Sequence, residues 1–280
     1  MNNELINTLI DLAIKEDIGN GDHSSLASIP EIAENTAELH VKSNGILAGI
    51  EISKKVFGKL MPNALIEYYM NDGDVMKPGD IAFRVTGNTQ KLLQAERLVL
   101  NFMQRMSGIA TTTHTYVSKI ADLKTKVLDT RKTTPGLRLI EKEAVRIGGG
   151  MNHRIGLYDM MMLKDNHLDY AGGIKKAINK AVEYQKQHGM NIPIEVEARN
   201  MDEVKQIMDA GKIHRIMLDN FDYDTTRAAV ELIGGQYETE SSGGITLDTI
   251  RPYALCGVDF VSVGALTHQI QSLDLSLKAV

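Results

Sequence analysis

The chain has 280 residues, of which 43% are hydrophobic and 24% charged, which is typical of a globular protein with a sizeable core. A net charge of -5 and the lack of a long apolar run argue against nucleic-acid-binding and membrane-spanning proteins. The first residues predict an amphipathic helix in place of a signal peptide, so we expect a cytoplasmic protein. The single cysteine, Cys256, rules out an internal disulfide and, among apolar neighbours, is expected to be a buried structural thiol.

The first hundred residues predict helices together with an antiparallel sheet. Apolar residues at helical spacing predict three helices, over residues 4–16, 51–60 and 91–106. Alternation in residues 36–50 and turn pairs within 72–79 predict strands joined by hairpins. At Ser107 and Gly108 we expect the third helix to break, with a separate helix over 109–122.

The rest of the chain alternates short apolar runs with helical patterns. Six runs that end in polar residues predict strands: KVLDTRK, DMMMLKD, IPIEVEA, HRIMLDN, YETESSGG and DFVSVGA. Three helical patterns lie between them, namely GGIKKAINKAVEYQKQ, DEVKQIMDA and TTRAAVELI. Strands that alternate with helices predict a parallel sheet with right-handed crossovers. Such short, regular units favour a barrel, and because an ordinary barrel has about eight strands, this one should be incomplete.

We therefore expect an α/β protein with two domains. Residues 1–108 are expected to form a mixed α/β sandwich domain with an antiparallel sheet. Residues 109–267 are expected to form an incomplete, about six-stranded parallel α/β barrel that carries the active site. The C-terminal tail, residues 268–280, is a candidate to pack on the first domain.

The active site of a parallel α/β barrel lies at the C-terminal ends of its strands. These ends divide by charge into two with cations, two with carboxylates and two with small residues. In chain order they carry Arg131 with Lys132, Lys164, Glu197, Asp219, Ser242–Gly244 and Gly264 with Ala265. Strand ends are polar in any protein because they meet solvent, but this alone does not explain so orderly a division.

The small residues fit a phosphate site. Barrel enzymes often bind phosphate after their last two strands, here at 242–244 and 264–265, because glycine lets backbone N–H groups approach an anion.

The two carboxylates, Glu197 and Asp219, fit sugar hydroxyls or a Mg²⁺ ion held beside a phosphate. The alternative is a salt bridge to Lys164 or Arg131. Glu195 shares a strand face with Glu197 and competes for the same role.

Basic residues gather in 129–167, where seven Lys or Arg outnumber five Asp or Glu. Some belong to solvated helix faces, but Arg131, Arg154 and Lys164 lie where no helical pattern explains them. Guanidinium groups bind carboxylates through two hydrogen bonds, so such a cluster suits a small dianion. A charge-paired structural network is the alternative, and His153 taken alone is more often a hydrogen-bonded core histidine.

Three glycines precede this histidine, at 148–150. We expect them to shape the approach that places His153 and Arg154, and not to hold a phosphate. The MMM run that follows is expected to be an ordinary core strand that delivers Lys164.

Nine segments stand out in the chain as a whole: EDIGNGDHSS, AERLVLNFMQRMSGIAT, TRKTTPGLR, EKEAVRIGGGMNHRIGLYD, LKDNH, EVEA, MLDN, ESSGG and VGALTH. In this order they resemble the quinolinate phosphoribosyltransferase family, also called nicotinate-nucleotide pyrophosphorylase (carboxylating), over nearly the whole length. The resemblance implies a pentosyltransferase of de novo NAD biosynthesis. Quinolinate and phosphoribosyl pyrophosphate would give nicotinate mononucleotide, CO₂ and pyrophosphate, with Mg²⁺. It also implies the sandwich and incomplete barrel expected above.

The resemblance implies a role for each candidate residue. It assigns the quinolinate pocket to Thr130, Arg131, Lys132, His153, Arg154 and Lys164, with Arg97 entering from the other subunit of a homodimer or higher homo-oligomer. It assigns the ribose hydroxyls and the metal to Glu197 and Asp219. It assigns the phosphate of phosphoribosyl pyrophosphate to Ser242, Gly243, Gly244, Val263, Gly264 and Ala265. The catalytic residues implied are Lys132, Lys164, Glu197 and Asp219.

Three other functions stay open. One is that of a related phosphoribosyltransferase-like protein found with molybdate transport genes, although TRKTTPG, NHR and LKDNH favour the quinolinate enzyme. A nicotinate-specific transferase would need fewer cations, because its substrate is a monocarboxylate. A non-catalytic phosphate-ligand sensor or carrier is the third, but the hairpin DGDVMKPGD lacks the lysine-flanked tip that carrier folds use for attachment.

Overall fold

The computed structural model describes residues 3–280, which divide into two compact units. The first unit comprises the chain up to His114 together with Thr133–Gly149 and Leu266–Val280, and the second comprises Thr115–Lys132 and Gly150–Ala265. Each unit is thus assembled from separated stretches of chain, whereas the predicted domains are residues 1–108, with the tail 268–280 as a candidate to join them, and residues 109–267.

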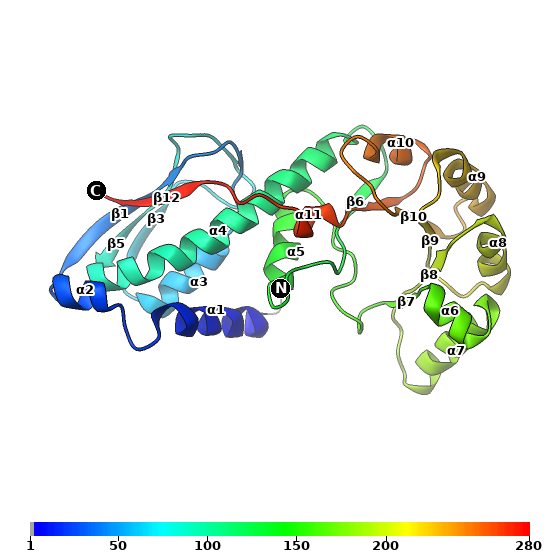
Figure 1. The fold of residues 1–280 in the computed structure, drawn as a ribbon, viewed down its shortest axis with the longest axis horizontal. Coiled ribbons are helices and arrows are strands. Elements are labelled where there is room, and N and C mark those ends of the chain that lie inside the picture. Colours follow the sequence, from blue (N-terminus) through cyan, green and yellow to red (C-terminus); the bar gives the residue numbers. More distant parts are fainter. Residues whose placement is uncertain (1–2) are drawn as a thin grey trace. The chain divides into compact units, whose positions relative to one another are not determined.

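The first unit is built on an antiparallel sheet, as predicted. Its strands are β1 (Glu34–Val41), β2 (Gly45–Ile46), β3 (Leu65–Tyr68), β4 (Val75–Met76), β5 (Ile81–Asn88) and β12 (Leu275–Ala279). Its helices are α1 (Asn3–Ile18), α2 (His23–Ser28), α3 (Ile50–Leu60), α4 (Thr89–Ser118, which continues into the second unit) and α5 (Arg138–Ile147). The main sheet has the order β12-β1-β5-β3, and β2 and β4 form a separate pair. The C-terminal strand β12 therefore lies beside β1 (Figure 1).

The core of the first unit is apolar. Leu39, Phe83 and Val85 of the sheet and Phe57 of α3 have no exposed surface. The rings of Phe57 and Phe83 pack edge to face with their centroids 5.7 Å apart. Burial of such side chains is the main source of this unit's stability.

The helix predicted to break at Ser107 and Gly108 is continuous. Ser107 is buried, and its hydroxyl accepts a hydrogen bond from the Ala48 N–H at 3.0 Å and donates to the Ala48 carbonyl at 3.2 Å. A Cβ atom at Gly108 would overlap the Gln271 carbonyl oxygen. The two small residues serve close packing of α4 within the first unit, and the predicted break is wrong.

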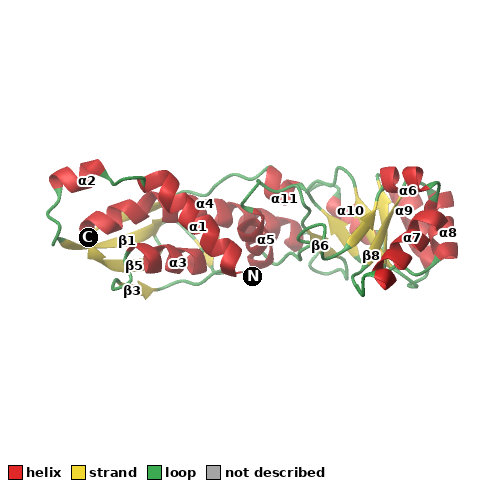
Figure 2. Ribbon diagram, turned by 90° about the horizontal axis from the view of Figure 1, so that it is seen from below, coloured by secondary structure: helices red, strands yellow, loops and turns green. Residues whose placement is uncertain are grey.

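The second unit contains the six predicted parallel strands. They are β6 (Lys126–Leu128), β7 (Met161–Leu163), β8 (Ile194–Ala198), β9 (Arg215–Asp219), β10 (Glu238–Ser242) and β11 (Phe260–Ser262). The helices of this unit are α6 (Asp165–Ala171), α7 (Ile174–Gln187), α8 (Met201–Ala210), α9 (Tyr223–Ile233) and α10 (Ile250–Leu255), and the single turn α11 (Ala265–His268) begins at its last residue. Figure 2 shows α7, α8 and α9 side by side along the strands.

The parallel sheet has the order β6-β11-β10-β9-β8-β7, so β6 and β7 are its two edges. Within residues 3–280 no ladder joins these edges, which agrees with the predicted incomplete barrel. Because β7 is an edge strand, Met161 and Met162 are only half-buried, and the prediction of an ordinary core strand there is wrong. In the same part of the chain, no helix combines the length and the apolar character needed to cross a bilayer.

Candidate active site

The candidate residues meet at the C-terminal edge of the parallel sheet in the second unit. In the order of the sheet, β6 ends in cations, β11 and β10 end in small residues, β9 and β8 end in carboxylates, and β7 ends in a cation. The loops after β10 and β11 come last in the chain, but in the sheet they lie between the cations that follow β6 and the carboxylates of β8 and β9. Such a rim can bind an anion beside a polyhydroxylated, phosphorylated molecule.

Two guanidinium groups converge at this rim. Arg131 follows β6, and Arg154 lies in the loop between Met151 and β7. Burial, and then the like charge of Arg131, lower the pKa of Arg154 below its ordinary value. Like charges are brought together at a cost in free energy, and an anion that binds between them relieves it. The pair is therefore a candidate anion site.

Asp129 positions the loop that carries Arg154. The carboxylate follows β6 directly, is fully buried, and accepts hydrogen bonds from the His153 N–H at 2.8 Å and from Asn152 Nδ2 at 2.7 Å. Just before these residues, the Met151 N–H donates to the Val127 carbonyl at 2.8 Å. The loop is thereby fastened to β6. Asp129 was not among the predicted site residues, although its place after a buried strand is a signal that sequence reasoning could have used.

Further contacts shape the same loop after Arg154. Asp159 accepts hydrogen bonds from the Ile155 N–H at 2.7 Å and the Gly156 N–H at 2.9 Å. The Arg154 guanidinium itself donates from Nη1 to the Met160 carbonyl at 3.2 Å. These bonds hold the guanidinium in place before any ligand binds.

Glycines lead into the loop, as expected, but the structure gives them packing roles. A Cβ at Gly148 would overlap the Ala110 carbonyl oxygen, so this glycine lets α5 pack closely on α4. Gly149 has a φ of 89°, a backbone conformation that favours glycine. The chain can thus turn sharply after α5.

His153 lies deeper than the arginines. It is 6% exposed, and both ring nitrogens face protein atoms. Nδ1 accepts the Arg154 N–H at 2.6 Å, while Nε2 lies 3.0 Å from Glu195 Oε2 and 3.4 Å from Glu240 Oε2. Its predicted contact with quinolinate stays a prediction, and the contacts seen here are those of an oriented, buried histidine.

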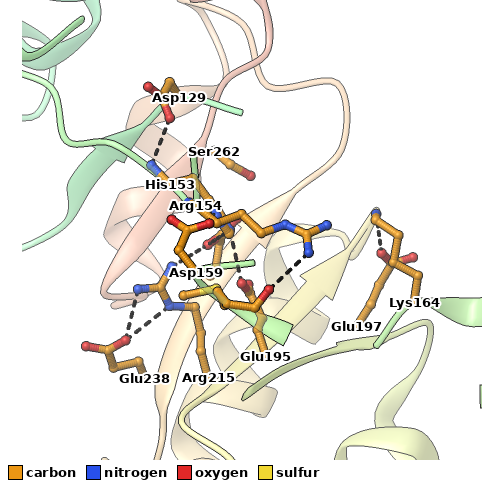
Figure 3. A network of polar contacts seen from close by, with 12 residues as sticks. Asp129, His153, Arg154, Asp159, Lys164, Glu195, Glu197, Arg215, Glu238 and Ser262 are labelled. Atoms are coloured by element: carbon orange, nitrogen blue, oxygen red, sulfur yellow. Dashed lines mark hydrogen bonds and ion pairs between the residues drawn. The ribbon is translucent and has the colours of Figure 1, made fainter. Parts of the chain in front are cut away.

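Lys164 and Glu197 form an ion pair at the other side of the rim. The Lys164 ammonium lies 2.8 Å from Glu197 Oε2, and the lysine is half-exposed while the glutamate is nearly buried (Figure 3). The Lys164 N–H donates to His167 Nδ1 at 2.9 Å, which caps α6 and fixes the backbone that carries the ammonium. Glu195, the competitor of Glu197, is fully buried below the rim. The alternative weighed from the sequence, a salt bridge from the carboxylate to Lys164, is present.

Asp219 and the loop after β10 are held together by Asn220. Asp219 pairs in register with Ser242, Asn220 Nδ2 donates to Asp219 Oδ2 at 2.7 Å, and the Asn220 N–H donates to the Ser242 carbonyl at 2.9 Å. Gly243 has a φ of 105°, and a Cβ there would overlap the Asn220 side chain. Only glycine therefore fits at this position, and Gly244 beyond it is exposed.

The remaining predicted residues vary in exposure. Val263 is buried, Gly264 and Ala265 are half-exposed, and Lys132 is exposed, with its N–H donating to Thr130 Oγ1 at 3.0 Å.

Arg97 and Cys256 are the two other residues for which the sequence predicts a role. Arg97 is exposed on α4 of the first unit, off the apolar stripe formed by its neighbours Leu98 and Val99. Cys256 is 5% exposed, and burial raises the pKa of its thiol, as expected for a structural cysteine.

Two groups of residues offer ligands for a cation. Glu197 and Asp219, the predicted metal residues, come from the neighbouring strands β8 and β9. Within residues 3–280, the one group of three side chains whose ligand atoms all lie within 4.8 Å of one another is His153, Glu195 and Glu240. The first pair is at the rim and the second group is buried.

Comparison with protein families identifies both halves of the chain. The N-terminal domain model of quinolinate phosphoribosyl transferase matches residues 22–107, and the C-terminal domain model matches residues 109–278. Quinolinate phosphoribosyltransferase (decarboxylating) 2b, mitochondrial, of Nicotiana tabacum is 45% identical over 284 residues, covering 95% of this chain and 80% of the relative. The probable nicotinate-nucleotide pyrophosphorylase (carboxylating) of Bacillus subtilis (strain 168) is 42% identical over 277 residues, covering 99% and 94%.

Solved structures have the same fold. NadC from Streptococcus pyogenes superposes with a TM-score of 0.93 at 37% identity and covers 100% of this chain and 99% of its own. The nicotinate-nucleotide pyrophosphorylase from Francisella tularensis gives a TM-score of 0.93 at 40% identity, with 100% and 98% covered. The family models span both units, and the relatives are similar over nearly the full length. The chain belongs to the quinolinate phosphoribosyl transferase family.

Proposed function

We propose that the chain converts quinolinate and phosphoribosyl pyrophosphate to nicotinate mononucleotide, CO₂ and pyrophosphate, a pentosyl transfer in NAD biosynthesis. The convergence of the Arg131 and Arg154 guanidinium groups carries the proposal. Quinolinate has two adjacent carboxylates, and each guanidinium can bind one through paired hydrogen bonds. A monocarboxylate such as nicotinate would leave one of the two cations unmatched. Thr130, Lys132, His153 and Lys164 complete the proposed pocket.

The phosphoribosyl group is assigned to the adjacent part of the rim. Loops at Ser242–Gly244 and Val263–Ala265 are expected to bind the 5′-phosphate through backbone N–H groups. Glu197 and Asp219 are expected to accept hydrogen bonds from the ribose hydroxyls. This arrangement would orient the anomeric carbon toward the ring nitrogen of quinolinate, whose carboxylates are bound by the arginines.

The chemistry then needs no covalent protein nucleophile. The pyridine nitrogen forms a bond to the anomeric carbon as the bond to pyrophosphate breaks, and a nearby carboxylate stabilises the positive charge that develops on the ribose. The bond between ring carbon 2 and its carboxylate then breaks and releases CO₂. The electron pair left on carbon 2 is stabilised by the adjacent quaternary nitrogen, and a proton completes nicotinate mononucleotide. Lys132 and Lys164 are expected to offset the charge of the leaving pyrophosphate.

Mg²⁺ is the proposed cofactor. Glu197 and Asp219 fit this ion because they offer carboxylate oxygens from neighbouring strands, and Mg²⁺ commonly binds one or two carboxylates together with substrate phosphates. When bound, the ion would supply positive charge to the pyrophosphate. Because Lys164 already pairs with Glu197, the substrate is expected to provide much of the ion's coordination.

We further propose a homodimer or higher homo-oligomer in which Arg97 completes the quinolinate pocket of the other subunit. The exposed position of Arg97 on α4, off the buried stripe, supports this role. The cytoplasm is the proposed location, although the tobacco relative is named as mitochondrial. Fractionation of the source cells tests the location.

Product analysis tests the proposed function. Purified protein with Mg²⁺ and phosphoribosyl pyrophosphate is supplied with quinolinate or nicotinate at equal concentration, and nicotinate mononucleotide is quantified. Quinolinate is expected to be the far better substrate, and omission of Mg²⁺ is expected to stop the reaction. Preference for nicotinate would assign the chain to the monocarboxylate reaction, and binding without turnover would indicate a sensor.

A further inference from the structure

Charged side chains occupy the interior of the second unit's sheet, where barrels of this kind usually bury branched apolar residues. Glu195 and Glu240 have no exposed surface, Arg215 is 8% exposed, and His153 is 6% exposed. Burying charges costs free energy unless they are paired, so the arrangement calls for a function.

Arg215 fixes one of the two glutamates. Its Nη1 donates to Glu240 Oε2 at 2.9 Å, and its guanidinium lies over the Phe260 ring at 4.0 Å. The other side of the guanidinium binds Glu238, with Nε and Nη2 both donating to Oε2 (Figure 3). A planar group held on three sides leaves Glu240 little freedom to move.

The two glutamates in turn fix the His153 ring. Nδ1 accepts the Arg154 N–H at 2.6 Å, which leaves Nε2 as the ring nitrogen that carries a proton. Burial lowers the pKa of His153, but the carboxylates of Glu195 and Glu240 outweigh it and raise this pKa to about 9. Nε2 lies 3.0 Å from Glu195 Oε2 and 3.4 Å from Glu240 Oε2, within ion-pair distance of both carboxylates. The ring is therefore held by a hydrogen bond at Nδ1 and by two carboxylates near Nε2, and a rotation of the ring would break these contacts.

A metal ion is the competing occupant of this cluster, because the three side chains offer ligand atoms within 4.8 Å of one another. The Nε2 proton would have to leave, and Arg215 already neutralises Glu240. Arg154 and Arg131 add further positive charge at the rim. A divalent cation in the cluster would face this charge with little to balance it.

We propose that Glu195 and Glu240 are positioning residues of the anion site. Through the imidazole of His153 they fix the main chain of Arg154, and with it the guanidinium that lies beside Arg131. The inference rests on the proposed function, since it assigns these residues to quinolinate binding.

Substitutions at Glu195 separate positioning from charge. Glu195→Gln keeps the length of the side chain and an oxygen acceptor for Nε2–H. Glu195→Asp keeps the charge but withdraws the carboxylate by one methylene, and Glu195→Ala removes both. We expect the Asp and Ala variants to raise the KM for quinolinate roughly ten- to hundredfold, and Gln to stay within about threefold of wild type. The KM for phosphoribosyl pyrophosphate should stay unchanged in all three.

Glu38→Gln is the matched control. Glu38 is also a buried glutamate that binds an arginine, Arg84, but it lies on β1 of the first unit. Its loss should lower thermal stability without changing the quinolinate KM. Wild-type KM in Glu195→Asp and Glu195→Ala, or a Gln variant as impaired as Ala, would overturn the positioning role. Absence of turnover in wild type would instead refute the proposed function.

A spectroscopic readout is independent of turnover. In protein labelled with ¹⁵N-histidine, the resonances lost in His153→Gln identify the ring nitrogens of His153. The wild type and Glu195→Gln should show a protonated Nε2. An Nε2 without a proton, or displacement of the Nε2 proton by added Zn²⁺ or Mg²⁺, would overturn the inference, the latter in favour of a metal site.

Discussion

The two sheets of this molecule have opposite interiors. In the first unit, Leu39, Phe83 and Val85 fill the space beneath an antiparallel sheet, and apolar burial stabilises it. In the second unit, Glu195 and Glu240 take the corresponding places in a parallel sheet and need partners to remain buried. An apolar interior maximises stability, whereas a charged interior gives up stability and orients the groups above it. The contrast indicates that the buried charges of the second unit serve the site above them.

Phe83→Ala should have the largest effect on stability. The substitution removes a fully buried ring that packs on Phe57, and we expect the free energy of unfolding to fall by about 3–5 kcal/mol. Chemical denaturation measures this loss. Ile32→Ala, at a 90% exposed apolar residue of the same unit, should change little. Equal losses for the two variants would contradict the view that apolar burial stabilises this unit.

Arg131→Ala should have the largest effect on catalysis. Without this guanidinium one carboxylate of quinolinate loses its cation, so kcat/KM for quinolinate should fall roughly hundredfold, or about 3 kcal/mol. Steady-state kinetics at low quinolinate measures the change. Arg227→Ala removes an arginine from the exposed face of α9 and serves as the control. Wild-type activity of Arg131→Ala would disprove the pocket assignment.

A mixture of two inactive variants tests the shared site. A dimer of one Arg97→Ala subunit and one Lys164→Ala subunit has one intact pocket if Arg97 crosses between subunits. Complete subunit exchange in an equal mixture should restore about a quarter of wild-type activity. Each variant alone should stay inactive, and no recovery after exchange would place Arg97 outside the pocket.

The smallest effect is expected at an exposed ion pair. Arg251 donates to both oxygens of Asp122 at 2.7 and 2.8 Å and lowers the pKa of Asp122 to about 2. Because the folded pKa lies below the ordinary value of 3.8, the stabilisation is present above that pH and is lost as pH falls toward 2. Asp122→Asn should therefore lower Tm slightly at pH 6 and by less at pH 2.5. An equal loss at both values would contradict this linkage.

Much of the second unit could be predicted because its signals are local. Five of the six strands contain apolar residues, whereas β10 (Glu238–Ser242) is polar throughout. The residues that follow each strand lie at the rim by the geometry of a parallel sheet. The continuity of α4 could not be predicted, because Ser107 and Gly108 owe their small size to Ala48 and Gln271, which are distant in sequence. A local pattern cannot distinguish a helix break from a close helix contact.

The buried network was missed for a different reason. Glu195 was recognised as sharing a strand face with Glu197, but the same two-residue spacing was not applied to Glu240 and Ser242 or to Arg215. Applied to every strand, it would have placed these charges on the interior face. Arg215 and Glu240 lie on β9 and β10, which are successive in the chain and paired in the sheet, so the same rule would also have brought them together.

The most direct test of the account follows the carboxylate that is lost. Quinolinate labelled with ¹⁴C in the carboxylate on ring carbon 2 is incubated with wild-type protein, Mg²⁺ and phosphoribosyl pyrophosphate. Labelled CO₂, pyrophosphate and nicotinate mononucleotide should appear in equal amounts. Pyrophosphate released without labelled CO₂, or a nucleotide that keeps the label, would contradict the decarboxylating transfer proposed for this site.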